Sequence, residues 1–433
     1  MARRKPNRPG IRTFAQCARN MTGILIKSVK HNYQLPTMTL DFSALHAQYR
    51  AELLDRTIPF WLTYGLDREY GGICTCISDD GKILSGDKYV WSQLRAIWTF
   101  AALYNKIEKR AEYLDAASQI FNFIARRGRN EKGEWLFCVN QKGAPLFNGA
   151  TTIYADGFAI YAFTEFAQAT GNADALGIAR ETYANAQARL AKPGSYQTHP
   201  LPIPAGTKAH GISMIFSLAF DEFGRFVNDD AIIRAGLAHA NQVMDVFRRP
   251  DHKRVFEFVN LDDALLTAPP GRAINPGHAI ESMWFMIHIF QRHNDRERVR
   301  QAIEVIRWNL ELGWDDAFGG IFLARDADGS FWEKNADTKI WWVHTEALYA
   351  LLLAYSITRE HWCLDWFARV HDYSFAHFPV AEYGEWIQNL DRRGNKLETT
   401  IALPVKDPFH LARALIYSVG VLEKLSRGLD STL

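Results

Sequence analysis

A loop motif recurs along the chain about every 65 residues, and this repeat limits the possible folds more than any other sequence feature. Each strong copy is a short alternating run that ends in a polar turn and a glycine, as in GGICTCISDDG. Such runs predict short strands that close on tight turns. The four strong copies span residues 71–81, 133–143, 319–329 and 384–394, and RVFEFVNLDDA, residues 254–264, is a weaker fifth copy.

One apolar residue of each strong copy stands eight residues before the closing glycine; we call these the anchor residues. The anchor residues are Ile73, Trp135, Ile321 and Trp386, with Val255 in the weaker copy. In chain order they lie 62, 120, 66 and 65 residues apart. The double interval predicts one more copy near residue 195, where KPGSYQTHP has a loop-like composition, so we expect six units.

Helical patterns fill the intervals between the loops. Apolar residues recur at i, i+3, i+4 and i+7 in WSQLRAIWTFAALYNKI, residues 91–107, and in KIWWVHTEALYALLLAY, residues 339–355. Each unit has room for two helices. We therefore expect an all-α fold, an (α/α)6 barrel of six helical hairpins with short β-hairpins at one end. An open helical solenoid is the alternative.

The first 37 residues differ in composition from the rest of the chain. They contain eight lysines and arginines, and the first acidic residue is Asp41. A basic segment without acids is typical of a disordered tail, or of a start placed too early, with Met38 as the true first residue. We expect residues 38–433 to form a single barrel domain and residues 1–37 to lie outside it.

Charge and cysteine content disfavour several classes of function. The 433 residues have a formal net charge of +2, which favours neither nucleic acid nor a membrane surface as a partner. No apolar run approaches the roughly 18–20 residues of a membrane span. The five cysteines are odd in number and lack paired metal-ligand spacing, which indicates a reduced, cytoplasmic protein.

Two histidines occupy matching places on two expected helix starts. NPGHAI, residues 275–280, and DPFHLA, residues 407–412, each consist of a cap residue, a proline, one residue and a histidine. Asn275 and Asp407 are favoured N-caps, and proline fits the first helical position, so His278 and His410 should both be third residues of their helices. They are 132 residues apart, two repeats of 66, and we expect them at the same end of the barrel.

The same repeat arithmetic brings other residues to this end. Arg95 and His344 stand 22 and 23 residues after their anchor residues, which predicts that they lie beside the histidines; His344 could line a pocket or support its helix start. A helix N-terminus disfavours imidazolium, so His278 and His410 should be neutral, as general bases must be. Glu281 follows His278 by three residues on the same helix face and could orient that imidazole.

Several segments closely resemble the N-acylglucosamine 2-epimerase family, which includes epimerases of N-acetylglucosamine, cellobiose and mannose and related aldose–ketose isomerases. The resemblance runs from about Asp41 to Leu425 and implies an (α/α)6 barrel. The segments are DKYVWSQLRAIWTFAALYN (87–105), INPGHAIESMWF (274–285), GGIFLARDADG (319–329), TKIWWVHTEALYALL (338–352), EYGEWIQNLDRRG (382–394) and KDPFHLARAL (406–415).

The resemblance also implies roles for single residues. His278 and His410 match the acid/base pair, Arg95 matches the arginine that binds substrate oxygens near C1 and C2, and Glu281 matches a motif carboxylate. The substrate is a small sugar, no cofactor or metal is required, and a homodimer is possible. The residues that the resemblance and the repeat positions together assign to the sugar pocket are Trp91, Trp341, Trp342, Arg272 and His344.

Two departures from the family pattern bear on the substrate. Members that act on free sugars often have a histidine in a middle helix, where this chain has Ile215 after Met214, with His210 further upstream. An apolar residue there favours the acetamido-sugar members. TTIALPVKDPFH, residues 399–410, replaces a Lys-Gly-Gly-rich loop of many acetamido-type members, so the pocket wall at that edge differs.

The expected reaction is inversion at C2 of an aldose, most simply an N-acylglucosamine or N-acylmannosamine. One base removes the C2 proton, an enediolate forms beside Arg95, and a second group returns a proton to the opposite face. Return of the proton to C1 would give a ketose, so an aldose–ketose isomerase or an epimerase of mannose or another unmodified sugar is the alternative.

Other functions have weaker support in the sequence. A metal site at His278, His410 and Glu281 lacks the H-E-x-x-H spacing. A glycoside hydrolase would need two carboxylates, for which Asp315, Asp316 and Glu385 are available in turn-like segments. A non-catalytic sugar-binding protein would not need the set of His278, His410 and Arg95.

Overall fold

A computed structural model describes residues 40–192, 194–268, 271–331, 333–397 and 405–429 of the chain. The basic segment 1–37 lies outside the described residues. From Leu40 onward the chain packs as one compact unit.

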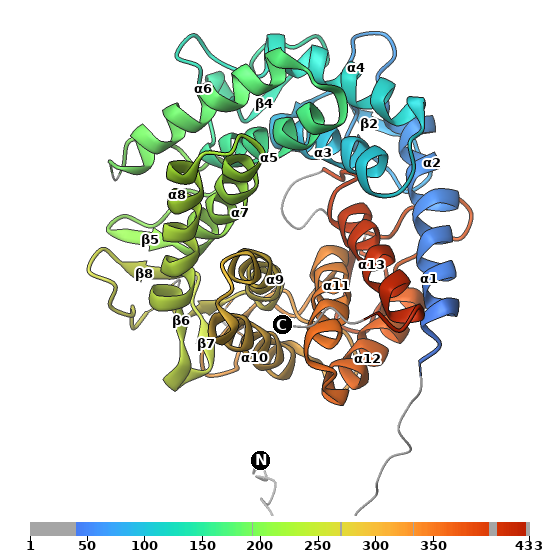
Figure 1. Cartoon of the computed structure of the whole chain (residues 1–433), viewed down its shortest axis with the longest axis vertical. Coiled ribbons are helices and arrows are strands. Elements are labelled where there is room, and N and C mark those ends of the chain that lie inside the picture. Colours follow the sequence, from blue (N-terminus) through green and yellow to red (C-terminus); the bar gives the residue numbers. More distant parts are fainter. Residues whose placement is uncertain (1–39, 193, 269–270, 332, 398–404, 430–433) are drawn as a thin grey trace, which may run out of the picture. The chain divides into compact units, whose positions relative to one another are not determined.

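The inner helices of this unit form a closed ring (Figure 1). Each one packs against the next in chain order, and the last, α13, packs against the first, α3. The closure excludes the open solenoid and confirms the barrel. The inner helices are α3 (Val90–Lys106), α5 (Ile153–Thr170), α7 (His210–Phe226), α9 (Pro276–Arg292), α11 (Trp341–Thr358) and α13 (His410–Ser426).

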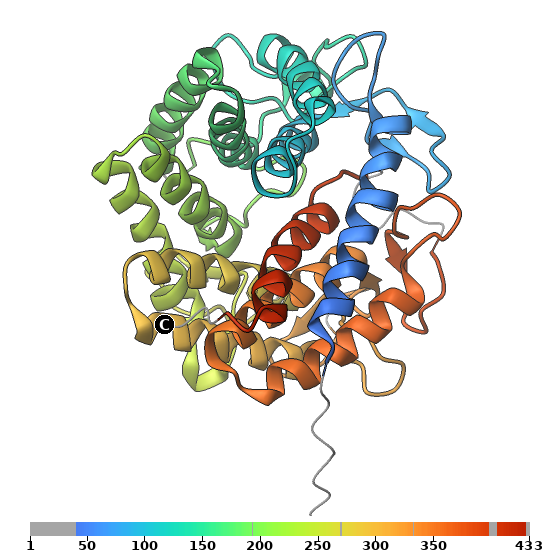
Figure 2. The ribbon, with the colours of Figure 1, turned by 45° about the vertical axis from the view of Figure 1, so that its right-hand side comes forward.

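A second layer of helices surrounds the ring. Each inner helix from α3 to α11 packs on the outer helix that follows it in the chain. The hairpin of α13 is closed differently, because its partner is α1 from the other end of the chain (Figure 2). The outer helices are α1 (Phe42–Ala51), which continues through a π-helical turn into α2 (Ile58–Phe60), and α4 (Ala111–Arg127), α6 (Ala173–Leu190), α8 (Asp230–Gln242), α10 (Arg296–Gly313) and α12 (His361–His377).

The two layers differ in sequence as their burial requires. Inner helices such as α5 and α11 are apolar on nearly every side, because one side faces the outer layer and the other faces the barrel interior. Outer helices such as α4 bury one apolar face and expose the opposite one. The outer helices α1, α6, α8 and α10 are capped by acidic or amide side chains, for example Asp229 at α8 and Asp295 at α10.

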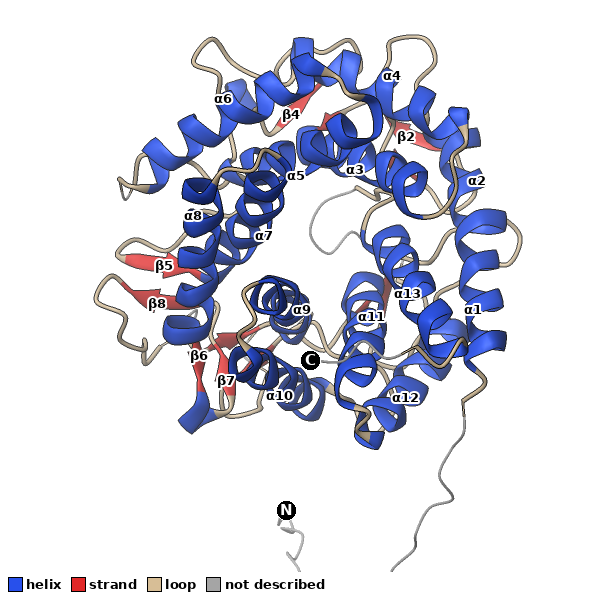
Figure 3. Cartoon of the chain, viewed as in Figure 1, coloured by secondary structure: helices blue, strands red, loops and turns tan. Residues whose placement is uncertain are grey.

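Short strands lie in the connections between helices (Figure 3). Most pairs join the strand before an inner helix to the strand after the following outer helix, as β3 with β4 and β11 with β12. The expected local β-hairpins form between β1 and β2 and between β6 and β7, and single antiparallel bridges close two further turns, Val139 with Pro145 and Leu390 with Lys396. The strands are β1 (Cys76–Ile77), β2 (Ile83–Ser85), β3 (Lys88–Tyr89), β4 (Cys138–Val139), β5 (Thr207–Ala209), β6 (Arg248–Arg249), β7 (Arg254–Val255), β8 (Phe258–Asn260), β9 (Ala273–Ile274), β10 (Arg325–Asp326), β11 (Lys339–Ile340) and β12 (Asn389–Leu390).

The anchor residues have one structural role in all five copies. Each is almost fully buried and forms an antiparallel bridge to a residue one or two positions after the end of the preceding helical segment, as Ile73 does with Leu66 and Trp386 with Pro379. The predicted sixth copy near residue 195 is wrong. The described residues there form turns, and the only bridge they make joins Thr198 to Thr152 at the start of α5.

Candidate active site

The short strands fix the direction in which the inner helices begin, so the helix ends that carry the predicted site residues lie close together. β9 leads directly into α9 and β11 into α11, and both strands pair antiparallel at the same end of their hairpins. His278 and His410 meet there on one indole ring. The centroids of their imidazoles lie 5.2 Å and 5.5 Å from that of Trp342, and Trp341 lies edge-on to His410 at 6.4 Å.

The two helix starts are not equivalent, contrary to the expectation. Asn275 caps α9 by accepting the backbone N–H of His278 at 3.0 Å, so His278 is the third helical residue as predicted. α13 begins at His410 itself, which makes His410 the first helical residue. Asp407 does not cap this helix, because its carboxylate accepts a hydrogen bond from Arg95 at 3.3 Å instead.

Arg95 is held by one acid and by aromatic faces. Besides Asp407, its guanidinium lies over Phe158 at 4.2 Å, Phe409 at 5.1 Å and Trp91 at 5.9 Å. Among the described residues nothing accepts a hydrogen bond from its Nε. Nε itself is buried, whereas the side chain as a whole is 19% exposed, so part of Arg95 can contact a ligand.

His278 is paired with a carboxylate that the sequence did not point to. Its Nδ1 lies 3.2 Å from Oε2 of Glu257, in the loop between β7 and β8. A carboxylate can only accept, so Nδ1 carries the proton and Nε2 remains free for a substrate. Burial lowers the pKa of His278, but the charge and hydrogen bond of Glu257 outweigh burial and the pKa lies above its usual value. The direction of this shift is opposite to the one expected from a helix N-terminus.

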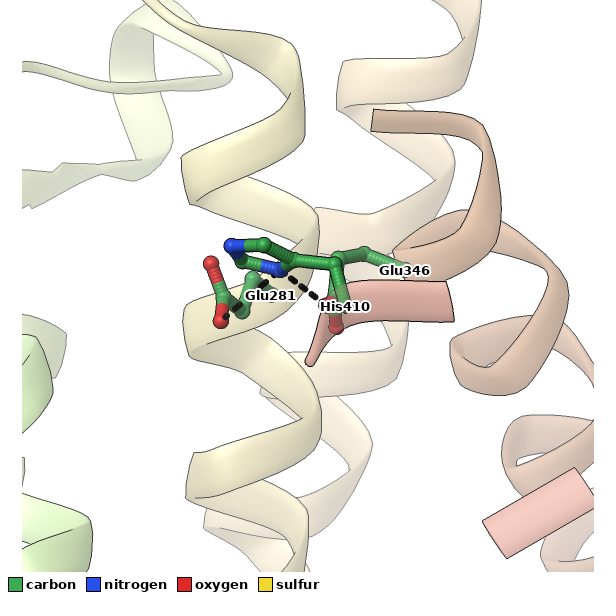
Figure 4. A group of neighbouring side chains, drawn as sticks. All are labelled: Glu281, Glu346 and His410. Carbon is green, nitrogen blue, oxygen red and sulfur yellow. Dashed lines mark hydrogen bonds and ion pairs between the residues drawn. The ribbon is translucent and has the colours of Figure 1, made fainter. Parts of the chain in front are cut away.

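His410 is paired in the same way but in a different electrostatic setting. Its Nδ1 lies 2.7 Å from Oε1 of Glu346, on α11 (Figure 4). The same oxygen accepts from Arg413 at 2.7 Å, and the other oxygen accepts from the indole of Trp284 at 2.8 Å. The pKa of His410 is lowered to about 3, chiefly by burial; the positive charges of Arg95 and Arg413 add to the decrease, and the negative charges of Glu281 and Asp407 oppose it. His410 is neutral, as expected.

Glu281 belongs to the cluster around His410. It accepts a hydrogen bond from Arg413 and lies 4.0 Å from Nδ1 of His410, so the expectation that it orients His278 is wrong. Ligand atoms of Glu281, Glu346 and His410 lie within 4.8 Å of one another, a spacing that a metal ion could use. The guanidinium of Arg413 already bridges both carboxylates and supplies the positive charge that a cation would bring.

The structure does not bring His344 to this cluster. Its side chain is fully buried, Nδ1 donates to the carbonyl of Ile340 at 2.8 Å, and Nε2 accepts the N–H of Ile321 at 2.9 Å. Burial lowers its pKa to about 3. With both nitrogens occupied by backbone groups, His344 supports the anchor residue of its unit and has nothing left to offer a sugar.

The remaining predicted residues are held in ion pairs elsewhere. Arg272, next to β9, binds Asp326 and Asp328, so its charge is neutralised within the β9–β10 region. The carboxylates considered for glycoside hydrolysis are also engaged or remote. Asp315 pairs with Lys339 and Arg392, Glu385 accepts from the indole of Trp61, and Asp316 is exposed.

The sequence patterns alone did not identify Glu257, Glu346 or Arg413 as site residues. The patterns around Glu346 and Arg413 nevertheless indicate buried charges. Glu346 lies inside an apolar helix, WWVHTEALYALL, and Arg413 inside HLARALIYSVG. A lone charge in a helix that is apolar on all sides must be buried and therefore paired. Glu257 had no comparable signal, because it lies in the weakest copy of the loop motif.

Comparisons with known proteins identify a family and confirm the fold. The family model described as N-acylglucosamine 2-epimerase (GlcNAc 2-epimerase) matches residues 71–414. The N-acylglucosamine 2-epimerase of Bos taurus is 31% identical, over 87% of this chain and 90% of the relative. A cellobiose 2-epimerase from Bacillus thermoamylovorans shares the fold at a TM-score of 0.77 and 21% identity, over 87% of this chain and 99% of its own. A D-mannose isomerase shares the fold at a TM-score of 0.73 and 18% identity, over 88% of this chain and 98% of its own.

Proposed function

The chain belongs to the N-acylglucosamine 2-epimerase family, and on that premise we propose that it interconverts an N-acylglucosamine and the corresponding N-acylmannosamine. One observation supports the chemistry above all others. Two imidazoles pack on a single indole, each has its Nδ1 bound by a carboxylate, and Arg95 lies near both. Each ring thus keeps Nε2 for a proton on the substrate.

The chemistry of the substrate makes this arrangement sufficient. The C2 proton of an open-chain aldose is acidic because C1 is a carbonyl. When one imidazole removes this proton, the electron pair moves to the C1 oxygen and an enolate forms, because C2 of an N-acyl sugar bears nitrogen where an unmodified aldose has a hydroxyl. The guanidinium of Arg95 stabilises the negative charge on the C1 oxygen. The second imidazole then protonates C2 on the opposite face, which inverts the carbon.

The N-acyl preference rests on the sequence relatives and on one wall of the barrel. The relative from Bos taurus, named for N-acylglucosamine, matches along most of the chain. Ile215 and Met214 on α7 are buried and apolar at the place where a histidine would favour an unmodified sugar. The likeness to the D-mannose isomerase concerns the fold alone and does not favour a ketose product.

We extend the proposal to the setting of the protein. Cys74, Cys76, Cys138 and Cys363 are free buried thiols, which suits a reducing compartment such as the cytoplasm. Of the described helices, none combines the length and the apolar character needed to cross a membrane. A homodimer and a single catalytic domain over residues 38–433 complete the proposal.

The test is incubation with N-acetylglucosamine, N-acetylmannosamine and mannose in D2O, followed by NMR. We expect the two N-acetyl sugars to interconvert and to gain deuterium at C2. Conversion of mannose to fructose with no change in the N-acetyl sugars would overturn the substrate. Binding of a sugar without any exchange at C2 would overturn the enzymatic function. The double variant His278→Asn/His410→Asn serves as the inactive control.

A further inference from the structure

Glu257 lies between two imidazoles that come from different inner helices. Its Oε2 is 3.2 Å from Nδ1 of His278 on α9, and its Oε1 is 3.7 Å from Nδ1 of His210, the first residue of α7. The ring of His210 is fully buried and packs on Phe247 with centroids 5.6 Å apart. No described residue forms a hydrogen bond with either ring nitrogen of His210, so Glu257 is the polar group it faces.

The backbone fixes Glu257 on both sides. Its carbonyl accepts the N–H of His210 at 2.9 Å, and its N–H donates to the carbonyl of Ala273 at 3.2 Å. Ala273 belongs to β9, the strand that leads into α9 and His278. The loop between β7 and β8 is thus joined to the starts of two inner helices, and the carboxylate cannot move independently of them.

The carboxylates behind the two bases have different partners. Glu346, behind His410, is shared with the guanidinium of Arg413 and the indole of Trp284. Glu257, behind His278, has only imidazoles as ion-pair partners within the described part of the chain. The charge of Glu257 is therefore available to hold a proton on His278, whereas the charge of Glu346 is already compensated.

We propose that Glu257 is the positioning residue of His278 and that His210 holds the Glu257 carboxylate in place, which makes the two bases unequal. This inference rests on the proposed function and adds a division of labour to it. Both imidazoles hold a proton on Nδ1, and at a given pH Nε2 of His278 is protonated to a larger extent than Nε2 of His410. When Nε2 of His278 carries a proton, the epimer whose C2 proton faces His410 meets a base on one side and an acid on the other.

The number of protons is conserved over one turnover. Nε2 of His410 takes the C2 proton, and the C–H electron pair forms the enolate with its negative charge on the C1 oxygen. Nε2 of His278 then gives its proton to C2 on the opposite face, and the electron pair returns from the C1 oxygen. The enzyme is left with the proton on His410 and a neutral His278, and exchange with solvent restores the resting state.

The charges around His278 come from three other elements and from its own helix. Glu257 and, through it, His210 face the ring from the β7–β8 loop and α7, Glu281 lies on α9, and Arg95 faces it from α3. Trp342 on α11 adds a stacked ring without charge. The raised pKa of His278 and the lowered pKa of His410 agree in direction with this arrangement.

Glu257→Gln tests the proposal through the pH dependence of kcat/KM. Loss of the carboxylate removes the charge that favours a protonated His278, so the alkaline limb of the profile should move to lower pH. The shift of the alkaline limb should be the same for epimerisation in either direction, because each direction requires one proton in total on the Nε2 atoms of His278 and His410. At pH 7 we expect kcat to fall about 10- to 100-fold, part of what a positioned acid–base group supplies.

Exchange at C2 provides a second measurement that a folding defect would not reproduce. At a pH above the titration of His278 in both proteins, where the ring is neutral, Glu257→Gln should slow deuterium wash-in most for the epimer whose C2 proton faces His278, because that base has lost its orienting partner and part of its basicity, and less for the other epimer. Glu257→Asp should restore part of the loss. His210→Phe keeps the packing on Phe247 and should move the alkaline limb of kcat/KM to lower pH by a smaller amount than Glu257→Gln does. Glu222→Gln, which removes an ion pair to Arg292 further along α7, is the matched control and should change neither readout.

NMR titration of the His278 ring makes the test independent of turnover. The His278 signal, identified by its loss in His278→Asn, should titrate at lower pH in Glu257→Gln than in the wild type. An unmoved titration, an unmoved alkaline limb, or equal losses of exchange from both epimers would overturn the role of Glu257. A wild type that exchanges no sugar at C2, with the titration shift intact, would overturn the proposed function alone.

Discussion

At the residue scale, the same side chain takes different states because its neighbours differ. His278, His344 and His410 are all near the start of an inner helix, yet the pKa of His278 is raised and those of the other two are lowered to about 3. Burial acts against the charged ring in all three. Only His278 has a carboxylate whose charge is not shared with a guanidinium, and this difference decides its proton occupancy.

Substitution of each base should separate the two faces of C2. His278→Asn and His410→Asn should each abolish net epimerisation, while each keeps deuterium wash-in from one epimer, because the other base still works on its own face. Arg95→Ala should suppress exchange from both epimers, since loss of one stabilising contact costs about 3–4 kcal/mol. NMR in D2O starting from each pure epimer gives the four exchange rates.

Near-normal net turnover in either histidine variant would contradict the two-base mechanism. So would one histidine that is essential for exchange from both epimers while the other is dispensable, a result that would indicate a one-base isomerase.

His344→Gln should be nearly neutral for both activity and stability. In the first unit Gln93 does the same work, accepting the N–H of Ile73 at 2.8 Å and donating to its carbonyl at 2.7 Å. A glutamine at 344 can accept the N–H of Ile321 in the same way. His344→Ala leaves that buried N–H unsatisfied beside a cavity and should cost about 2–4 kcal/mol in the free energy of unfolding. Urea unfolding of both variants checks the contrast, and a large loss of activity with intact stability in His344→Gln would instead indicate a pocket role.

At the element scale, buried lysines fasten the strands that precede two inner helices. Lys88 on β3 binds Asp67 at 2.8 Å, and Lys339 on β11 binds Asp315 at 3.2 Å, each with its side chain fully buried. Each lysine also donates to a carbonyl of a neighbouring loop, as Lys88 does to Gln141 and Lys339 to Arg392 at 2.6 Å. The start of each inner helix, and with it the site, is therefore tied to the loops by a buried ion pair.

Asp315→Asn should lower stability in a pH-dependent way. Burial raises the pKa of Asp315, but Arg392 and Lys339 bring it down to about 2, below the value of an unfolded aspartate of about 3.9. Its contribution is therefore complete above pH 4 and is lost as the pH falls to 2. We expect the variant to be less stable at pH 7 by about 3–5 kcal/mol, because Lys339 is left buried without its partner, and to lose less than the wild type between pH 4 and 2.

Urea unfolding at pH 7 and across pH 2–4 measures both effects. Asp316→Asn is the matched control, because Asp316 is the exposed neighbour and its loss should change stability by less than about 0.5 kcal/mol. Equal pH dependence in the wild type and Asp315→Asn would contradict the assignment.

At the scale of the whole molecule, the ring is closed by parts from opposite ends of the described chain. α1 packs on α13, the helix that begins with His410, and Tyr49 of α1 donates or accepts a hydrogen bond with His371 of α12 at 3.1 Å. The indole of Trp386 donates to Glu52 at 2.7 Å, just after α1. The position of His410 thus depends on a helix more than 300 residues away in sequence.

Two truncations should separate the first helix from the segment before it. A chain that begins at Met38 keeps every contact described between residues 40 and 429 and should unfold at the same temperature with unchanged activity. A chain that begins at Ile58 lacks α1 and should lose cooperative unfolding and activity, because α13 then exposes an apolar face. Thermal unfolding by circular dichroism and the epimerisation assay check both, and normal activity of the shorter chain would show that closure by α1 is dispensable.

The sequence by itself determined the repeat, and through the repeat the barrel. Periodic anchor residues and helices that are apolar on all sides are local patterns, and hydrophobic burial converts them into two layers of helices whatever the details of the loops. The cap of α9 and the placement of His278 and Arg95 near one end followed from the same periodicity. The absent sixth copy and the start of α13 did not follow, because long-range contacts replaced the local signals there.

Only the tertiary structure decided which groups act on each histidine. The sequence around Asp407 predicts a helix cap, but its carboxylate binds Arg95. The spacing of Glu281 predicts contact with His278, but Glu281 binds Arg413. His344 has the repeat position of a site residue, but its ring forms hydrogen bonds with the backbone. The partner of His278 is Glu257, from a loop whose sequence is unremarkable. Spacing along a helix specifies the face on which a side chain lies. The charges around that side chain come from other helices and loops, which ring closure brings beside it. The proton occupancy of a histidine depends on those charges, so it could not be predicted from spacing alone.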